Sequence, residues 1–395
     1  METPRYEVLS SLKQVREMLK ATERAQLVAL DVQAEGTEAV GATLTGVSLC
    51  FEPGHVYHAP LDPEGTDSDA ILRELRPLLG VSSAPKVMHD SKPGLVVLAQ
   101  RGVEPGAPSF DTLLAAFLLD GKAYALEDLI TERLGPSAGE RTAREAQERT
   151  RNVCGRVDAV LRLGRLLEAE LGERGQLAYL RELELQLVPV LADMELAGVA
   201  VDTAALEDLS IYLAGKLHDL EREIAEVAGH EVDPRSPRRL GELLYEKLGL
   251  EGSRRTSSGR YSTDALALAA LAGQHPVVEK IVEHRHLSRL KDAYADSLPG
   301  LVNPQTGRVH TSFSQVSASS GRLVSREPNL QNIPVRTQLG REIRGAFVAD
   351  ASGLGIRGPT VLLSVDYSQI ELRVLAHMTG EPALREAFQK GEDVH

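Results

Sequence analysis

The sequence of 395 residues has only two cysteines, no tryptophan and no long apolar run. Cys50 and Cys154 are too few to cross-link a chain of this length, and they do not form a metal-ligand pattern. The longest wholly apolar run, residues 265–272, is far shorter than the ~20 residues that cross a bilayer. The opening segment METPRYEVLS lacks the apolar core of a signal peptide. We therefore expect a protein of the reducing cytoplasm, with no membrane partner.

Positive charge is also scarce overall. The formal net charge is −13, which taken alone argues against a nucleic-acid partner. The sign is unevenly distributed, however, because residues 235–345 contain 17 Lys or Arg against 10 Asp or Glu. Such asymmetry is typical of a protein in which one region faces phosphate and another does not. Chance clustering on a solvated face is the alternative, and charge alone does not decide between the two.

The first part of the chain alternates short apolar runs with helical patterns, within a composition typical of a globular protein of two or three domains. Runs rich in Val, Leu and Thr predict strands at 27–32, 43–51, 55–60 and 86–89. Helical spacing predicts helices at 69–79, 92–101, 111–119 and about 140–170, with Asp111 as an N-cap. Three meandering strands joined to helix–strand–helix units indicate an α/β fold of the nuclease type.

From about residue 176 the pattern becomes mainly helical. Apolar spacing predicts helices at 176–197, 203–228, 236–248 and 276–298. Gly198 is expected to end the first, while Ser236 with Pro237 is expected to begin the third. Residues 251–263, EGSRRTSSGRYST, are rich in Arg, Ser and Gly and predict a mobile basic loop.

The closing segment SVDYSQIELRVLAH, residues 364–377, follows the apolar run VLLSV. The run predicts a strand with Asp366 at its tip, where a carboxylate projects beyond the edge of a sheet. A helix is expected to begin near Ser368. Its buried stripe would be Ile370, Val374 and Met378, which recur at four-residue spacing.

Residues 319–336, SSGRLVSREPNLQNIPVR, form an unusually polar loop. Its Asn and Gln amides both donate and accept, which suits base edges and the sugars beside them. Because the minor groove offers acceptors at equivalent positions on every base pair, such contacts would test pair geometry without reading sequence. The alternative is a long loop that its own amides hold in place.

SGRLVSREPNLQNIPVR, GREIRGAF and VDYSQIELRVLAH together resemble the palm entry and first polymerase motif of family A DNA polymerases, the bacterial DNA polymerase I type. SPRRLGELLYEKLGL, HRHLSRLKDAY and NPQTGRVHTSFSQ resemble the thumb of the same family and its return to the palm. LVPVLADMELAGVAVD resembles the opening of the polymerase region. The resemblance spans nearly the whole chain.

This resemblance implies three domains. Residues 1–174 would form an α/β ribonuclease-H-like domain of the 3′–5′ exonuclease type. Residues 175–308 would form the palm-entry helix and a mainly helical thumb, and residues 309–395 the N-terminal part of an incomplete α+β palm. The implied activity is DNA-templated DNA synthesis in replication and repair, with primer–template DNA, deoxynucleoside triphosphates and two Mg²⁺ ions.

The resemblance also assigns roles to residues. Asp366 would be one of two metal-bridging aspartates, with the backbone carbonyl of Tyr367 as a further ligand, although Asp366 could also cap the following helix. Glu371 would close over the sugar of the incoming nucleotide and exclude a 2′-hydroxyl, the alternative being a solvated helix acid. Further nucleotide contacts are implied for Gln369, Arg322 and His395.

Duplex contacts are implied over the thumb and the polar loop, as a sequence-independent grip on phosphates and sugars. The residues are Arg289, Lys291, Arg254, Arg255, Asn329, Gln331, Asn332 and Arg336. For Arg289 and Lys291 the alternative is an exposed, charged helix face.

The nuclease-like domain departs from its family. Proofreading by two-metal chemistry needs about four carboxylates. Asp31 is present, but Gln33 stands where a glutamate is expected, and Gly94 and Arg156 stand where two aspartates are expected. Asp90 replaces an asparagine. We therefore expect a nuclease fold without nuclease activity that serves as a rigid support.

The family continues beyond the first motif into the fingers and a palm segment with the second metal-binding aspartate. We expect the chain to be incomplete without that C-terminal portion, inactive alone, monomeric, and associated with DNA in the bacterial cytoplasm. Two alternatives remain open, a non-catalytic duplex-binding fragment and a 3′–5′ exonuclease. Primer extension separates the first alternative from a polymerase.

Overall fold

The computed structural model describes residues 5–22, 25–61, 67–80, 84–104, 106–136, 149–252, 255, 259–350, 352–356 and 358–394, with the backbone alone at 149–154 and 353. Residues 1–347 form one compact unit and residues 348–395 a second. The first part of the helix predicted at about 140–170, and part of the basic loop at 251–263, lie outside the described residues. Among the described helices, none is both long enough and apolar enough to cross a membrane.

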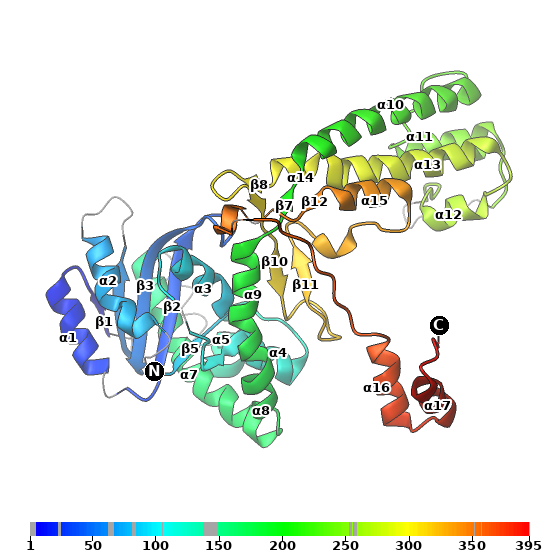
Figure 1. The fold of residues 1–395 in the computed structure, drawn as a ribbon. Coiled ribbons are helices and arrows are strands. Elements are labelled where there is room, and N and C mark those ends of the chain that lie inside the picture. Colours follow the sequence, from blue (N-terminus) through cyan, green and yellow to red (C-terminus); the bar gives the residue numbers. More distant parts are fainter. Residues whose placement is uncertain are drawn as a thin grey trace. The chain divides into compact units, whose positions relative to one another are not determined.

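A mixed six-stranded sheet with the order β1-β4-β3-β2-β5-β6 forms the first part of the larger unit (Figure 1). Its strands are β1 (Arg5–Val8), β2 (Val28–Glu35), β3 (Thr43–Glu52), β4 (His55–Pro60), β5 (Lys86–Met88) and β6 (Phe110–Asp111). β2, β3 and β4 form the predicted antiparallel meander, and β1, β5 and β6 join it in parallel. The sequence did not predict β1, a short edge strand whose residues are mostly exposed.

Helices pack on this sheet and on one another. They are α1 (Leu12–Thr22), α2 (Ser68–Leu79), α3 (Ser91–Gln100), α4 (Thr112–Asp120), α5 (Leu126–Leu134) and α7 (Arg149–Glu173), with α3 and α7 in direct contact with the strands. Asp111 is confirmed as an N-cap, since its carboxylate accepts hydrogen bonds from Leu113 N at 2.9 Å and Leu114 N at 3.3 Å. The apolar faces of these helices and of the sheet form one continuous core.

A helical stretch connects this domain to the rest of the unit. It consists of α8 (Leu177–Tyr179), the π-helical turn η1 (Leu180–Glu184) and α9 (Leu185–Ala197). Figure 1 shows α9 between the sheet domain and the strands β10 and β11. Gly198 ends the helix as predicted, with a φ of +56°. A side chain there would place its Cβ 2.7 Å from His310 Nδ1, so the turn accepts glycine alone.

The segment predicted to be the thumb, and called the thumb below, contains helices of which α10 and α13 pack side by side (Figure 1). Its elements after β7 (Ala200–Val201) are α10 (Thr203–Ala228), α11 (Pro237–Gly241), η2 (Glu242–Lys247), α12 (Ala265–Ala270), α13 (Pro276–Leu290), η3 (Lys291–Ala295) and α14 (Ser297–Gly300). Ser236 caps α11 as predicted, with its side chain accepting from Arg239 N. Two apolar clusters, one at each end of α10, hold these helices together.

Short strands follow the thumb. They are β8 (Val302–Asn303), β9 (Arg308–Val309), β10 (Ser312–Ser314) and β11 (Val324–Arg326), followed by the 3₁₀ turn η4 (Leu330–Asn332), α15 (Gln338–Gly345) and β12 (Phe347–Val348). β10 and β11 form an antiparallel pair in which Phe313 faces Ser325. The sequence predicted only a loop at 319–336, because a three-residue strand is recognisable only once its partner β10 is known.

The second unit contains η5 (Ser352–Leu354), α16 (Ile370–Thr379) and α17 (Pro382–Lys390). The predicted strand at 361–365 is wrong, since the run is irregular and Val361 and Leu363 are 86% and 84% exposed. The predicted buried stripe is also wrong, because Ile370, Val374 and Met378 are exposed. A strand needs a neighbouring strand, and the described residues of this unit supply none. α17 packs on α16 but leaves these three side chains exposed.

Candidate functional site

The polar loop at 319–336 is held by its own amides. Asn329 Oδ1 accepts from Gln331 N at 3.0 Å. Gln331 Oε1 accepts from Ser325 N at 2.8 Å, and its Nε2 donates to Leu323 O at 2.9 Å. These contacts favour the structural alternative for Asn329 and Gln331, whose predicted DNA contacts stay a prediction. The Asn332 side chain is exposed, while its carbonyl accepts from Tyr294 Oη at 2.6 Å.

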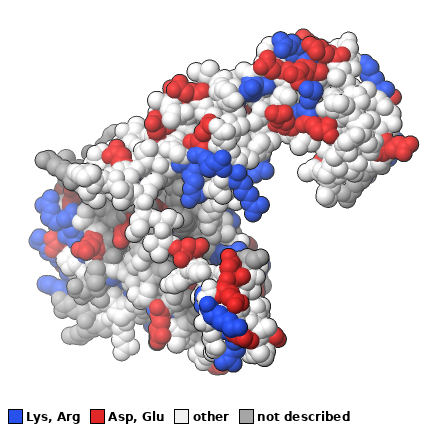
Figure 2. Space-filling view, turned by 45° about the vertical axis from the view of Figure 1, so that its right-hand side comes forward, with Lys and Arg blue, Asp and Glu red and all other residues white. Residues whose placement is uncertain are grey.

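Exposed arginines accompany this loop. Arg336 and Arg341 lie together, since Arg341 Nη1 donates to Arg336 O at 3.3 Å. Arg341 and its neighbour Arg344 on α15 were missed by sequence reasoning, although their three-residue spacing in GREIRG was visible. Figure 2 shows a group of Lys and Arg side chains near the middle of the view, whereas acidic and basic side chains are intermixed at its upper right. The arginines exposed along this segment are Arg322, Arg326, Arg336, Arg341 and Arg344.

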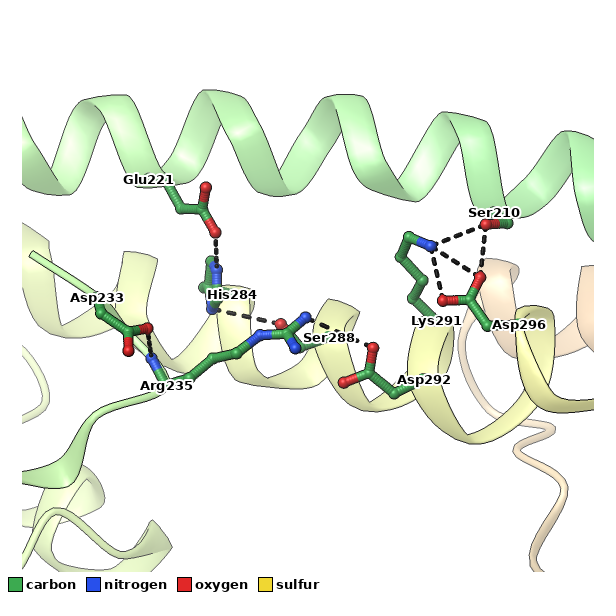
Figure 3. Close-up of polar contacts among 9 residues, drawn as sticks. All are labelled: Ser210, Glu221, Asp233, Arg235, His284, Ser288, Lys291, Asp292 and Asp296. Carbon is green, nitrogen blue, oxygen red and sulfur yellow. Dashed lines mark hydrogen bonds and ion pairs between the residues drawn. The ribbon is translucent and has the colours of Figure 1, made fainter.

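Lys291 is engaged inside the thumb (Figure 3). Its ammonium donates to both carboxylate oxygens of Asp296 at 2.7 Å and to Ser210 Oγ at 2.8 Å. These donors, the lysine first, hold the pKa of Asp296 below its usual range. Lys291 therefore ties η3 to α10, whereas Arg289 on the neighbouring turn is exposed. Of the two predicted phosphate contacts, Arg289 is the better placed.

A second polar contact joins the same two thumb helices (Figure 3). His284 is fully buried on α13, and its Nε2 donates to Glu221 Oε1 on α10 at 3.1 Å. The other ring nitrogen lies 3.4 Å from Ser288 Oγ. Arg235, at the turn before α11, pairs with Asp292 at 3.5 Å. Polar contacts as well as apolar packing therefore hold the thumb helices together.

The basic loop before α12 is described only in part. Arg255 Nη1 donates to Gly259 O at 2.7 Å, and the guanidinium lies 4.5 Å from the centre of the Tyr261 ring. The Arg255 side chain therefore closes its own loop, although it is exposed. Two other predicted contact residues, Arg254 and His395, lie outside the described residues.

The first polymerase motif lies in the second unit. Asp366 is exposed and Tyr367 is 80% exposed. Gln369 donates to Asp393, and Glu371 is exposed on the first turn of α16. A carboxylate and a carbonyl are the hard oxygen donors that Mg²⁺ prefers. In the described part of the chain, however, no group of three His, Cys, Asp or Glu could hold an ion, so the donor type fits while the donor number does not.

In the nuclease-like domain, Gln33 and Asp31 are bonded to each other. Gln33 Nε2 donates to Asp31 Oδ2 at 2.7 Å and to Asp31 O at 3.0 Å. Burial raises the pKa of Asp31, and this amide and the charge of Arg156 oppose the shift. The Arg156 guanidinium itself pairs with Glu127 of α5. An amide and a guanidinium thus lie next to the one carboxylate retained from the expected ligand set.

Gly94 and Asp90 complete the departure from a nuclease. A Cβ at Gly94 would lie 3.1 Å from the Cβ of Val32 on β2, so an aspartate does not fit there without displacing Val32. Asp90 has a left-handed backbone with a φ of +49°, and its amide donates to Asp111 Oδ1 at 3.2 Å. Burial, followed by the charge of Asp111, raises the pKa of Asp90 to about 6.

Two buried charged residues were not singled out from the sequence. Lys92 of α3 and Glu195 of α9 form an ion pair and are 8% and 2% exposed. A signal was present, because Glu195 continues the helical spacing of the buried residues Val188 and Leu191. An acid on the buried stripe of an apolar helix needs a buried partner.

Two family models match the chain. One, described as DNA polymerase family A, matches residues 203–395, and one described as 3'-5' exonuclease matches residues 6–153. Among curated proteins, the DNA polymerase I of Synechocystis sp. is 38% identical over 403 residues, which is 96% of this chain and 40% of the relative. The thermostable DNA polymerase I of Thermus thermophilus is 41% identical over 329 residues, covering 82% of this chain and 37% of the relative.

A solved structure agrees with these matches. It is the POL domain of Pol1 from M. smegmatis in complex with DNA primer-template and dNTP, with a TM-score of 0.84 and 32% identity. The comparison covers 99% of this chain and 66% of that one. Of the curated relatives, in contrast, the chain spans only about two fifths of the length. It belongs to the family A DNA polymerases, as a DNA polymerase I homologue with a 3′–5′ exonuclease-like domain followed by the polymerase region.

Proposed function

We propose that this chain is part of an enzyme for DNA-templated DNA synthesis in the bacterial cytoplasm, and that it binds primer–template DNA but does not extend a primer alone. One observation carries the proposal: an exposed Asp366 in the first polymerase motif, in a chain whose fold matches a polymerase over 99% of its length. The described residues offer this carboxylate no second acidic partner for a metal.

The proposed DNA grip rests on exposed cationic and amide groups. Arg289 on the thumb and Arg336 with Arg341 beside the polar loop present charge that phosphates would neutralise. Because such binding releases counterions, the affinity should fall steeply with salt. Asn332 and the unused amide hydrogens of Asn329 would face sugars or base edges.

The proposed metal site is incomplete among the described residues. Asp366 and the carbonyl of Tyr367 would contribute two oxygen donors to Mg²⁺, and further carboxylates would have to come from elsewhere. We therefore derive no catalytic step from these residues. Glu371 and Gln369 lie on the helix that follows Asp366, and we propose that they face the incoming nucleotide.

We further propose that the nuclease-like domain does not cleave DNA. Of the expected ligands only Asp31 remains, and its carboxylate is occupied by Gln33. A guanidinium at position 156 repels rather than binds a cation.

Primer extension tests the proposal. The chain alone, with Mg²⁺ and deoxynucleoside triphosphates, should bind a labelled primer–template and leave it unextended. A chimera that continues the chain with the remaining polymerase region of the Thermus thermophilus relative should extend the primer. Asp366→Ala in the chimera should reduce extension by roughly a thousandfold or more, as expected for a group that carries the reaction. Glu386→Ala, an exposed acid of the same unit, is the matched control.

The alternatives give different results in the same assays. A non-catalytic duplex-binding fragment predicts binding by the chain but no extension by the chimera. A 3′–5′ exonuclease predicts shortening of single-stranded DNA with Mg²⁺, at a rate lost in Asp31→Ala. Extension by the unmodified 395-residue chain would refute our account of the incomplete metal site.

A further inference from the structure

A buried ion pair joins the nuclease-like domain to the helix that leads into the palm segment. Lys92 of α3 donates its ammonium to Glu195 of α9, and both side chains lie almost wholly out of water. Removing two charges from water is costly, and an apolar pair of the same volume is often at least as stable. The presence of this pair therefore needs a reason other than stability.

The same carboxylate oxygen has a second donor. Glu195 Oε1 accepts from Phe313 N at 2.6 Å, in the middle of β10. The backbone carbonyl of Glu195 accepts from His310 Nδ1 at 2.6 Å, just before that strand. One glutamate thus connects α3, α9 and β10, and Lys92 is the only contributor from the nuclease-like domain among the described contacts of this carboxylate.

Two pockets border this connection. One of about 460 Å³ is lined by Gly94, Glu195 and Arg326 among others. Another of about 460 Å³ is lined by Lys92 and, again, Arg326. Apolar packing joins α3 to α9, because residues of both helices belong to the same core. The bond from Phe313 N to Glu195 adds a specific polar connection from these helices to β10.

Hydrogen bonds connect β10 to the polar loop, so the position of the strand affects the position of the loop. β10 pairs with β11, and Thr311 Oγ1 donates to Arg326 O at 2.9 Å and Pro328 O at 2.8 Å. Ser325 on β11 in turn holds Gln331. We propose that Lys92 is a positioning residue by which the nuclease-like domain fixes the β10–β11 pair, and through it the loop at 319–336. The consequence for primer–template binding rests on the proposed function.

Removing the ammonium would weaken the bridge. In Lys92→Met, the buried Glu195 carboxylate keeps only its backbone donor, so it must take up a proton or turn toward water in the cavities. Either change loosens its bond to Phe313 N. The amide hydrogens of β10 and β11 should then exchange faster, while the core of the sheet domain stays intact.

Hydrogen–deuterium exchange on the full chain tests this directly. In Lys92→Met, exchange over residues 309–316 and 323–331 should rise roughly tenfold, the factor expected for the loss of one charge-assisted hydrogen bond. Lys86→Met is the matched control, because Lys86 is also buried in the nuclease-like domain but donates to Gly80 O at 2.8 Å. It should change exchange in those segments by less than about twofold. Lys92→Arg, which keeps a donor, should restore most of the protection.

Every outcome is decisive. Unchanged exchange in Lys92→Met, or an equal rise in Lys86→Met, would overturn the proposal. If Lys92→Met does not fold, Glu195→Gln replaces it and should raise exchange about threefold, since an amide oxygen is a weaker acceptor than a carboxylate. Primer–template affinity should fall in parallel with the loss of protection. If the unmodified chain binds no primer–template at all, the proposed function fails, and the exchange data still decide the role of Lys92.

Discussion

The nuclease-like domain and the unit at 348–395 differ in opposite ways in their apolar packing and in the functional residues that they retain. The domain has a continuous core and a well-packed sheet, but its expected metal site has lost most of its carboxylates. The smaller unit retains Asp366 and its motif, yet its apolar run and helix faces are exposed. The domain is well packed although we propose that it has no nuclease activity, and the smaller unit carries the polymerase motif although much of its apolar surface is exposed. Folding and catalysis therefore impose separable demands on this chain.

The largest expected effect comes from matched leucines in the two regions. Leu30→Ala in β2 should lower the free energy of unfolding by about 2–5 kcal/mol, because Leu30 is 2% exposed and its removal leaves a cavity. Leu363→Ala should change it by less than ~0.5 kcal/mol, because that side chain is 84% exposed. Urea denaturation followed by circular dichroism measures both. Equal effects would mean that the run at 361–365 is packed in solution.

Asp90→Asn should stabilise the chain in a pH-dependent way. The folded state holds the pKa of Asp90 at about 6, above its unfolded value. The stabilising contribution of its proton is therefore complete below about pH 4 and is lost as the pH rises through about 6. Asparagine removes this loss, so the variant should gain on the order of 1–3 kcal/mol at pH 8 and almost nothing at pH 4. Thermal unfolding at both values checks the sign, and a gain at pH 4 would contradict it.

Gly94→Asp should fail to restore a nuclease. The new side chain must displace Val32, which should cost about 1–3 kcal/mol of stability. It would also add a carboxylate to a site in which Arg156 and Gln33 remain. We expect no shortening of single-stranded DNA with Mg²⁺ and a lower melting temperature. Gly172→Asp, at a helix position with open space around it, controls for the added charge. Detectable trimming would show that the site needs fewer ligands than we infer.

The smallest effect should distinguish two neighbouring cations of the thumb. Arg289→Ala should weaken primer–template binding by roughly two- to fivefold and reduce its salt dependence, as expected for one phosphate contact. Lys291→Ala should instead lower thermal stability, since it frees Asp296 and Ser210. Fluorescence anisotropy at two salt concentrations and a melting curve separate the roles. A salt-dependent loss of binding in Lys291→Ala without destabilisation would reverse them.

Sequence reasoning succeeded where local signals are strong. The meander β2–β3–β4, the caps at Asp111 and Ser236, and the stop at Gly198 follow from strand composition and capping chemistry, and the structure confirms them. It failed where structure depends on partners distant in sequence. β11 was missed because it exists only beside β10, and the strand at 361–365 was predicted because an apolar run reads the same with or without a neighbour.

The candidate site shows the same limit. Motifs predicted roles for Asp366 and for the degenerate positions at 33, 94 and 156 from residue type alone, and these roles stay predictions. The motifs did not reveal that the side chains of Gln331 and Lys291 form hydrogen bonds to other groups of the protein, namely Ser325 N and Asp296. Nor did they reveal the bridge from Lys92 to Glu195, whose partners lie about a hundred positions apart. Side-chain availability is a property of the folded surroundings.

The close contact between position 94 and Val32 has an evolutionary consequence. A lineage that first regained an aspartate at 94 would lose stability and gain no cleavage, because Gln33 and Arg156 would still bar the metals. Changing either of those first brings no benefit while glycine occupies 94. If the domain does not cleave DNA, as we propose, then each single substitution toward a nuclease is harmful or useless by itself. Recovery of cleavage would need several substitutions together.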